Sequence, residues 1–512
     1  MYDVYKRFCT PHRAEFVLNL KKISNFLLKN PRERTESNGF RSYWKASTTG
    51  PRKQGGASAG MKRTRPEGGG EDEGEAGASA EDGLRETRQR LGDEDAGGTG
   101  SGLNLVLAEV PADEQISNLL EIVSDMASSK PGVQQPLLRR TASLSFDIEG
   151  AARSLLPSEV PPLYPRAWVT AKRAMGERSK AGVQLKFMQF NVLADGLSGE
   201  DPHKGGFDAV PPLSLDWKFR RINLVREIFR QGVWPDIISM EEVDHYYDWF
   251  EPLLRQLGYC SHYTAKPNSP CKIVSPHSGL EDGCALFWRS DTVAMKQIES
   301  LNYNAYTPEG KPTGSKSNQV AILATLQVKG ATPIVAAVTH LSAAKTAEGE
   351  HVRAQQMQEL LQNLARYKLP CIVGLDMNAE PGGNKYAAEA YPLAISKKIN
   401  LGEHEAPLRS AYAEVMGTEP SWTTWKKRSG NGKTGEVSHT IDYVLISEQI
   451  ECTRVLMPPA DVDVVPERLP GWSYPSDHVA LLAELVIPGE IPAGDSRGGE
   501  GDGEGGGEGG VG

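Results

Sequence analysis

The sequence has no run of about 18 consecutive apolar residues, which is the length that a membrane-spanning helix requires. It contains six cysteines among 512 residues, and none of them forms a CxxC pair. The missing pair argues against a zinc module and favours free thiols in a reducing compartment. We therefore expect no membrane association and a cytoplasmic location, while the basic, partly amphipathic first 26 residues leave targeting to an organelle open.

Excess positive charge is also missing. The segment 182–488 carries 29 basic and 36 acidic residues. A protein that binds a long nucleic acid usually presents a basic face, because neutralising phosphates supplies most of that affinity. The acidic balance disfavours such a partner, although a local groove can still be positive.

Composition divides the chain into three parts. Residues 47–102 and the C-terminal end are rich in Gly, Glu and small residues, and such segments cannot bury enough apolar surface to fold. We expect residues 1–180 to be mostly disordered with isolated short helices, one of them amphipathic within 104–129. We expect residues 181–488 to form the folded domain and 489–512 a disordered tail. The sequence "RRTASLSF" makes Thr141 and Ser143 possible substrates of a basophilic kinase, or part of a solvated linker.

Apolar segments with strand and helix periodicity alternate over 185–487, which predicts one α/β domain. Several predicted strands follow one another without a helix between them, so we expect mixed or antiparallel sheets. The predicted strands tend to end at a polar residue. Such residues at strand ends gather at one edge of a layered domain, where sites are built. They are Asn191, Glu242, His340, Asp376, Asn378, Asp442, Asp477 and His478.

These side chains predict a metal-assisted reaction. Carboxylate and amide oxygens without cysteine favour a hard cation such as Mg²⁺ or Mn²⁺ over zinc. The segment 181–488 has neither a GxSxG elbow nor a GxxxxGK[ST] phosphate loop. The simplest chemistry is hydrolysis of a phosphate ester, in which a histidine oriented by a carboxylate activates water or stabilises charge.

The motifs "FMQFN", "SMEEVD", "VTHL", "LDMNAEP", "HTIDY" and "YPSDH" occur in the order typical of the endonuclease/exonuclease/phosphatase superfamily, which the chain resembles over about 185–487. Further segments, including "KPNSPC", "NQVAI" and "RLPGWSYPSDH", are most similar to nocturnin-type proteins within the carbon-catabolite-repression-type deadenylase branch. The resemblance implies a four-layer αββα sandwich.

The resemblance also implies individual roles. Glu242 would be the main metal ligand and Asp477 a second one, for one or two Mg²⁺ ions. The implied catalytic group contains His478, its orienting partner Asp442, the phosphate contact His340, and Asp376, Asn378 and Asn191. Lys266, Asp282 and Asn318 would line the substrate pocket. We add Lys345 to them as a substrate-binding residue, although it stands one place after the position that is usually basic.

Some positions depart from the nocturnin-type pattern. Ser342, Ala344 and Ser438 stand where basic residues are usual, and Phe190 and Glu241 replace a usual Trp and Gln. Lys345 and the cations of "TTWKKRSGNGKTGE" offer compensation. The metal and histidine set is complete, whereas the substrate-reading set is partly changed.

Three hypotheses follow. The first is a Mg²⁺-dependent hydrolase that removes the 2′-phosphate of NADP(H), with another phosphorylated nucleotide as a related substrate. The second is a 3′-exoribonuclease that shortens single-stranded poly(A). The third is a catalytically silent binding protein. We expect a monomer. Because adjacent strand residues face opposite sides, Asp442 rather than Asp477 should lie within hydrogen-bond reach of the His478 ring.

Overall fold

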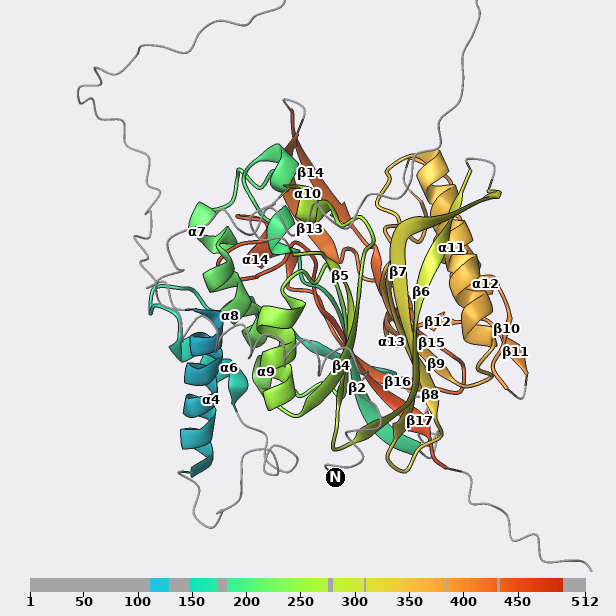
Figure 1. Cartoon of the computed structure of the whole chain (residues 1–512), viewed down its shortest axis with the longest axis horizontal. Helices are drawn as coiled ribbons and strands as arrows, with labels where there is room; N and C mark the ends of the chain where they lie inside the picture. Colours follow the sequence, from blue (N-terminus) through green and yellow to red (C-terminus); the bar gives the residue numbers. More distant parts are fainter. Residues whose placement is uncertain are drawn as a thin grey trace, which may run out of the picture. The chain divides into compact units, whose positions relative to one another are not determined.

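The computed structural model describes residues 111–128, 147–172, 182–274, 280–307, 310–383, 385–402, 404–430 and 433–490. Two β-sheets pack face to face, and helices cover both outer faces (Figure 1). This is the predicted four-layer αββα sandwich. Thr141 and Ser143 lie outside the described residues. None of the helices in the described ranges has the length and hydropathy of a membrane span.

The first sheet has seven strands in the order β1-β16-β17-β2-β3-β5-β4. Only its β2–β3 pair is parallel, as expected where a helix separates two strands. The strands are β1 (Trp168–Thr170), β2 (Gly182–Asn191), β3 (Ile237–Glu241), β4 (Tyr259–Ala265), β5 (Gly283–Arg289), β16 (Glu451–Leu456) and β17 (Leu481–Pro488).

The second sheet has six strands in the order β12-β15-β9-β8-β7-β6, with β8 and β9 parallel. Two small two-stranded sheets, β10–β11 and β13–β14, accompany it. The strands are β6 (Val293–Tyr306), β7 (Pro312–Val328), β8 (Ile334–His340), β9 (Cys371–Asp376), β10 (Ile399–Asn400), β11 (Glu405–Ala406), β12 (Arg409–Ser410), β13 (Thr424–Gly430), β14 (Lys433–His439) and β15 (Asp442–Ile446).

Helices α4, α6, α8 and α9 lie on the outer face of the first sheet, and α11 and α12 on that of the second (Figure 1). The helices are α4 (Ala112–Ser128), α6 (Ile148–Ser154), α7 (Pro212–Leu215), α8 (Trp217–Ile228), α9 (Glu251–Gln256), α10 (Pro270–Val274), α11 (Ala347–Ala365), α12 (Ala390–Ser396), α13 (Ala411–Met416) and α14 (Asp461–Val464). Shorter turns are η2 (Asp195–Leu197), η3 (Pro202–Lys204), η4 (Arg230–Gly232) and η5 (Tyr246–Phe250).

The alternation along β2 explains how the layers form. Leu185 and Phe187 belong to the core between the two sheets, whereas Met188 and Phe190 belong to the core beneath the outer helices. Successive strand residues point to opposite faces. Gln189, which follows the alternation onto the inter-sheet side, reaches the other sheet with a hydrogen bond of 3.2 Å to Asp442.

The N-terminal region differs from the sequence prediction. The expected amphipathic helix is present as α4, but it is not isolated, because Ile116 and Leu119 are buried in the same core as the apolar face of α8. Arg221 Nε of α8 also donates to Gln115 Oε1 at 2.7 Å. In addition, β1 pairs with β16 although it precedes the predicted boundary at residue 181. Ordered structure therefore begins before that boundary.

Candidate active site

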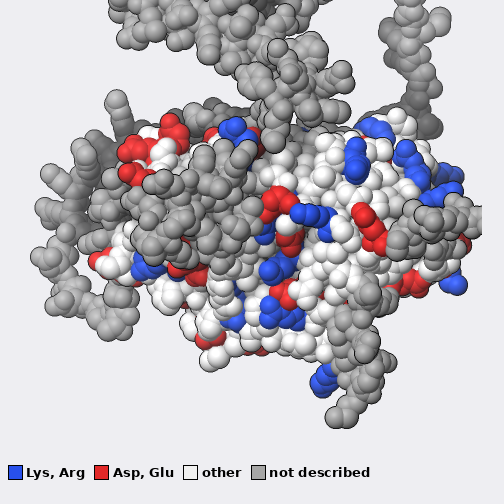
Figure 2. All heavy atoms as spheres, turned by 90° about the horizontal axis from the view of Figure 1, so that it is seen from below, with Lys and Arg blue, Asp and Glu red and all other residues white. Residues whose placement is uncertain are grey.

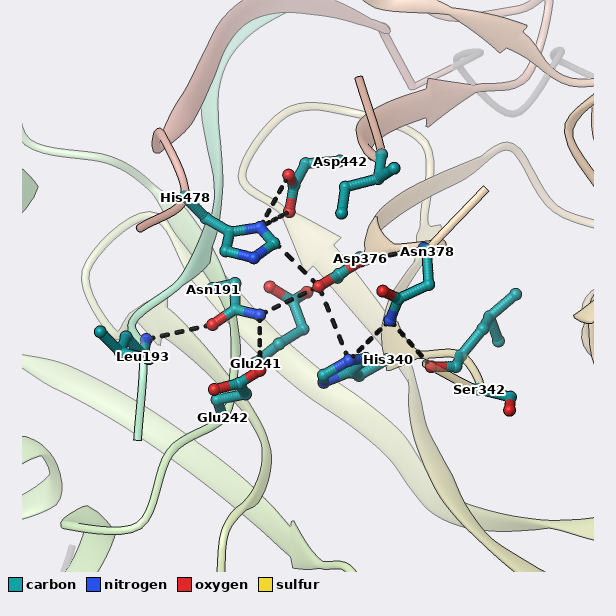
Figure 3. Close-up of polar contacts among 12 residues, drawn as sticks. Asn191, Leu193, Glu241, Glu242, His340, Ser342, Asp376, Asn378, Asp442 and His478 are labelled. Atoms are coloured by element: carbon teal, nitrogen blue, oxygen red, sulfur yellow. Dashed lines mark hydrogen bonds and ion pairs between the residues drawn. The ribbon is translucent and has the colours of Figure 1, made fainter. Parts of the chain in front are cut away.

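The predicted strand-end residues meet at one end of the sandwich, centred on β9. The register places Asp376, the last residue of β9, opposite both Asp442 of β15 and His340 of β8. Asn191 reaches across from β2 of the other sheet, and its Nδ2 donates to Asp376 Oδ2 at 3.0 Å. Figure 3 shows these side chains converging from both sheets.

Two of the site residues lie just beyond strand ends in left-handed backbone. Glu242 and Asn378 both have φ of 55°. This conformation is uncommon for residues other than glycine, and such strain clusters at functional sites. Its effect here is to aim side chains inward. Glu242 Oε1 accepts from Asn191 Nδ2 at 3.2 Å, and Asn378 Nδ2 lies 2.9 Å from His340 Nε2.

His478 is paired with Asp442, as the sequence predicted. Its Nδ1 lies 2.9 and 3.1 Å from the two Asp442 oxygens, whereas Asp477 Oδ2 is 3.9 Å from Nε2. Two further groups donate hydrogen bonds to Asp442: the Thr423 hydroxyl at 2.7 Å and Gln189 Nε2 at 3.2 Å. Together with His478, they hold the carboxylate on three sides. Burial opposes charge on the imidazole, but Asp442 together with Asp477 and Asp376 outweighs it and raises the pKa of His478 to about 9.

Carboxylates accumulate beside this pair. Burial, together with the charge of Asp442, raises the pKa of Asp376 to about 7. The same two causes raise the pKa of the fully buried Glu241 well above its usual value. Half-buried Glu242 adds a further carboxylate. A cation in this cluster would relieve the repulsion among these groups.

The donor set fits a divalent cation that prefers oxygen. Among the described residues, one group of potential ligand atoms lies within 4.8 Å of one another, on Asp376, Asp442 and His478. Asp442 already accepts three hydrogen bonds, so it is less available than the remaining carboxylates. Glu242, which lines the cavity described below, and Asp376 are therefore the better placed oxygen ligands.

A second buried group surrounds His340. Lys266 Nζ lies 2.6 Å from Asp282 Oδ2 and 3.4 Å from His340 Nδ1. Burial and the neighbouring charges of Lys266 and His478 lower the pKa of His340 well below its usual value, so its ring is neutral near pH 7. A cation and a neutral imidazole side by side suit contact with a phosphate group. Asn318, by contrast, hydrogen-bonds the backbone of Asn268.

Asp477, a predicted metal ligand, uses only one of its two oxygens in contacts with cations. Its Oδ2 accepts from Lys426 at 2.6 Å and from Arg428 at 2.7 Å. Burial opposes ionisation of this carboxyl, but these two cations outweigh it and lower its pKa. Lys426 Nζ also lies 3.2 Å from His478 Nε2. Oδ2 therefore fixes cations of the β13–β14 hairpin, whereas the buried Oδ1 has no hydrogen-bond partner among the described residues and is available to a metal ion.

Part of this group of site residues, including Glu242, His340, Asp376 and His478, lines a cavity of about 480 Å³. The cavity connects the carboxylates Glu242 and Asp376, which could hold a metal ion, with a wall that contains basic side chains. Of the predicted substrate-pocket residues, Lys345 lines the cavity, whereas Lys266, Asp282 and Asn318 are not among its lining residues. Its polar lining includes Glu242, His340, Lys345, Glu350, Arg353, Asp376, Asn378, Glu380, Lys385, Tyr386, Lys426, Arg428, Glu436, His439 and His478.

Several of these residues were not predicted from the sequence. Glu350 and Arg353 lie within the predicted helix of α11, and Lys385 and Tyr386 lie in a polar loop with no periodicity. His439 is inside the "HTIDY" motif, which predicted that the segment contributes to the site through Asp442 but gave no role to the His439 side chain. Only the tertiary arrangement brings the five together.

Comparison with known proteins agrees with this geometry. Residues 188–478 match the Endonuclease/Exonuclease/phosphatase family. The chain is 36% identical to nocturnin of Mus musculus over 64% of this chain and 70% of that protein, and 37% identical to nocturnin of Homo sapiens over 59% and 65%. It is 25% identical to carbon catabolite repressor protein 4 homolog 2 of Arabidopsis thaliana over 73% and 69%.

The family match spans more than half of the chain and contains the strand-end residues from Asn191 to His478. A buried histidine–carboxylate pair, a carboxylate cluster and a basic cavity wall are the groups that hydrolysis of a phosphoester bond requires. The chain belongs to the endonuclease/exonuclease/phosphatase family, in its nocturnin-like branch, and is a hydrolase that acts on phosphoester bonds.

Proposed function

We propose that the protein is a Mg²⁺-dependent phosphatase that removes the 2′-phosphate of NADP(H) to give NAD(H). The observation that carries the proposal is the cavity, which joins a carboxylate and histidine centre to cations on a separate wall. NADP(H) carries a 2′-phosphate, which is removed, and a pyrophosphate, which must be bound elsewhere. Its binding therefore requires both the carboxylate and histidine centre and the basic wall.

The chain's own residues divide the work. His478, oriented by Asp442, activates water or stabilises the charge that develops on the phosphoryl group. His340 binds the phosphate oxygens from the cavity wall, and the buried Lys266 beside it contributes its positive charge. Glu242 would hold Mg²⁺ together with Asp376, and the bound ion would polarise the phosphoryl group. The pyrophosphate would then meet Lys345, Lys426 and Arg428 on the cavity wall.

The size and lining of the cavity support a small substrate. Cavities of about 300–1,000 Å³ are typical of small-molecule sites, and this one measures about 480 Å³. A protein that binds single-stranded nucleic acid without sequence preference typically has a continuous basic groove with stacking aromatics, whereas the acidic Glu350, Glu380 and Glu436 stand among the basic residues of this lining. The cavity therefore favours the dinucleotide. Figure 2 shows basic and acidic side chains interspersed over the described part of the face seen from below, at the end away from the β13–β14 hairpin.

The direct test is phosphate release from NADP⁺ by the purified full-length protein with Mg²⁺, and the product should be NAD⁺. Glu242→Ala should abolish release, because it removes the best placed metal ligand. Addition of EDTA to the wild type should do the same and be reversed by excess Mg²⁺. Wild-type release no faster than that of Glu242→Ala would refute the proposal.

The alternative function is removal of poly(A) by 3′-exonucleolytic hydrolysis. It is favoured by the similarity to carbon catabolite repressor protein 4 homologs, and the same centre can act on a phosphodiester. A labelled oligo(A) incubated under the conditions of the NADP⁺ assay separates the two. Shortening of oligo(A) without NADP⁺ hydrolysis would favour the alternative.

A further inference from the structure

Two loops form the outer wall of the cavity. The first, 341–346, follows β8 and carries Lys345 toward the cavity. The second, which includes residues 385–389, follows β9 and precedes α12. Neither loop is part of a sheet, so the position of Lys345 depends on whatever holds these loops in place.

One buried ion pair on α11 reaches both loops. Arg353 Nη1 donates to the backbone oxygens of Ser342 at 2.9 Å and of Ala344 at 2.7 Å. Its Nε and Nη2 donate to Glu350 Oε2 at 2.9 and 2.7 Å. The other Glu350 oxygen accepts from the backbone N–H groups of Glu389 and Ala390 at 2.9 and 3.0 Å. The pair thus joins the two loops through a single helix.

A second connection is made directly between the loops. Tyr386 Oη donates to the backbone oxygen of Lys345 at 3.0 Å. The next residue, Thr346, is the N-cap of α11, and its hydroxyl accepts from Gly349 N at 3.0 Å. The backbone of Lys345 is therefore held on both sides and at its own carbonyl.

Three cations, Lys345, Lys426 and Arg428, line the same cavity. Lys345 is exposed to solvent, yet partial burial of its ammonium group and the like charges of Lys426 and Arg428 lower its pKa. Asp477 pairs with Lys426 and Arg428 and not with Lys345. An anion that enters the cavity would be attracted to all three cations.

We propose that Glu350, Arg353 and Tyr386 are positioning residues that fix Lys345 as an anion ligand opposite Lys426 and Arg428. A second phosphate group would then be recognised by the two connected loops, 341–346 and the one that includes 385–389. This binding region is separate from the His340 and His478 centre. The ligand is a pyrophosphate or a similar multiply charged phosphate. The inference deepens the proposed function, whose substrate carries such a group.

The experiment measures binding of two probes, inorganic pyrophosphate and NADP⁺, by calorimetry on the full-length protein in EDTA, where turnover is suppressed. Lys345→Ala should raise both dissociation constants about tenfold, because it removes a charged hydrogen-bond donor. Tyr386→Phe should raise them about threefold, because one neutral hydrogen bond is lost. Arg353→Lys should weaken binding more than Tyr386→Phe, since it releases two carbonyl groups.

A double variant separates positioning from general stability. Tyr386→Phe should have no further effect on binding in the Lys345→Ala background, because it acts only through Lys345. Tyr306→Phe is the matched control: its phenol makes one hydrogen bond, of 2.9 Å to Glu359, and does not line the cavity. That control should bind both probes as the wild type does.

The outcomes distinguish this inference from the proposed function. Unchanged binding by Tyr386→Phe and Arg353→Lys would overturn the inference, as would additive effects of Tyr386→Phe and Lys345→Ala. Failure of the wild type to bind either probe would overturn it as well. If NADP⁺ binds with the expected pattern of variants but is not hydrolysed in Mg²⁺, the proposed function fails and the positioning role stands. In an active enzyme, Tyr386→Phe should raise KM about threefold and leave kcat unchanged.

Discussion

Among single residues, the neighbours Asp477 and His478 have separate partners, although adjacent acid and imidazole groups invite the interpretation that they pair with each other. His478 turns Nδ1 to Asp442, and Asp477 turns to Lys426 and Arg428. Lys426 lies between the two, close to both side chains. Each carboxylate thus organises a different part of the site: one orients the histidine, and the other holds the basic hairpin.

This division predicts different kinetic effects for the two carboxylates. Asp442→Asn should lower kcat by about 10²–10⁴-fold, because the substitution disturbs the orientation of His478. KM should change little, because Asp442 does not line the cavity. Steady-state kinetics on the substrate that the wild type hydrolyses would measure it. The comparison variant Asp477→Asn should mainly raise KM, because it loosens two cations. Equal effects of both variants on kcat and KM would contradict the assignment.

Among the elements, the β13–β14 hairpin is the one that completes the site. Thr423, just before it, fixes Asp442, and Lys426 and Arg428 point from it to Asp477. The strand ends were predictable because apolar runs that stop at a polar residue are local patterns. The contact of Thr423 with Asp442 was not predictable, since it depends on how the hairpin folds back. The contact of Gln189 with Asp442 was not predictable either, since it joins residues far apart in sequence across the two sheets.

The turn η5 and the start of α8 are joined by a histidine whose charge depends on pH. The His245 ring stacks on Trp217 with centroids 4.1 Å apart, and its Nδ1 lies 2.8 Å from Asp248. Burial disfavours the charged ring, but the neighbouring carboxylates of Asp195, at 3.7 Å from Nε2, and of Asp248 outweigh it and raise the pKa of His245 to about 9. Below its unfolded value of about 6.5 the histidine contributes its full stability, which is lost as pH rises through about 9.

We therefore expect the wild type to lose about 1–3 kcal/mol of stability through this histidine between about pH 6 and about pH 10. Urea unfolding at a series of pH values would measure the loss. Other groups titrate in the same range, so the control is His245→Gln, which should show a correspondingly shallower decline above about pH 7. Parallel curves for the two proteins would show that the histidine is not charged in the folded state.

In the whole molecule, the segment before β2 is connected to the catalytic end. Arg166 and Glu227 form a fully buried ion pair of 2.6 Å, and Arg166 also donates to the backbone oxygen of Ala480 at 2.7 Å. Tyr474 Oη donates to Glu227 at 3.0 Å and accepts from Ala480 N at 2.9 Å. The N-terminal segment therefore supports the loop that precedes His478. Composition alone did not reveal this, because one arginine in a proline-rich stretch looks like part of a linker.

A chain that starts at Gly182 should consequently be less stable than one that starts at Pro111. It would lack α4, α6 and β1, expose the apolar face of α8 and leave Glu227 with Arg230 as its remaining close cation. Breaking a buried ion pair costs about 3–5 kcal/mol, and the lost apolar contacts add to this. Thermal unfolding of the two chains would measure the difference, and Arg166→Met in the longer chain should reproduce part of it. Equal melting temperatures would instead mean that the catalytic domain begins at β2 and that the preceding segment only rests on its surface.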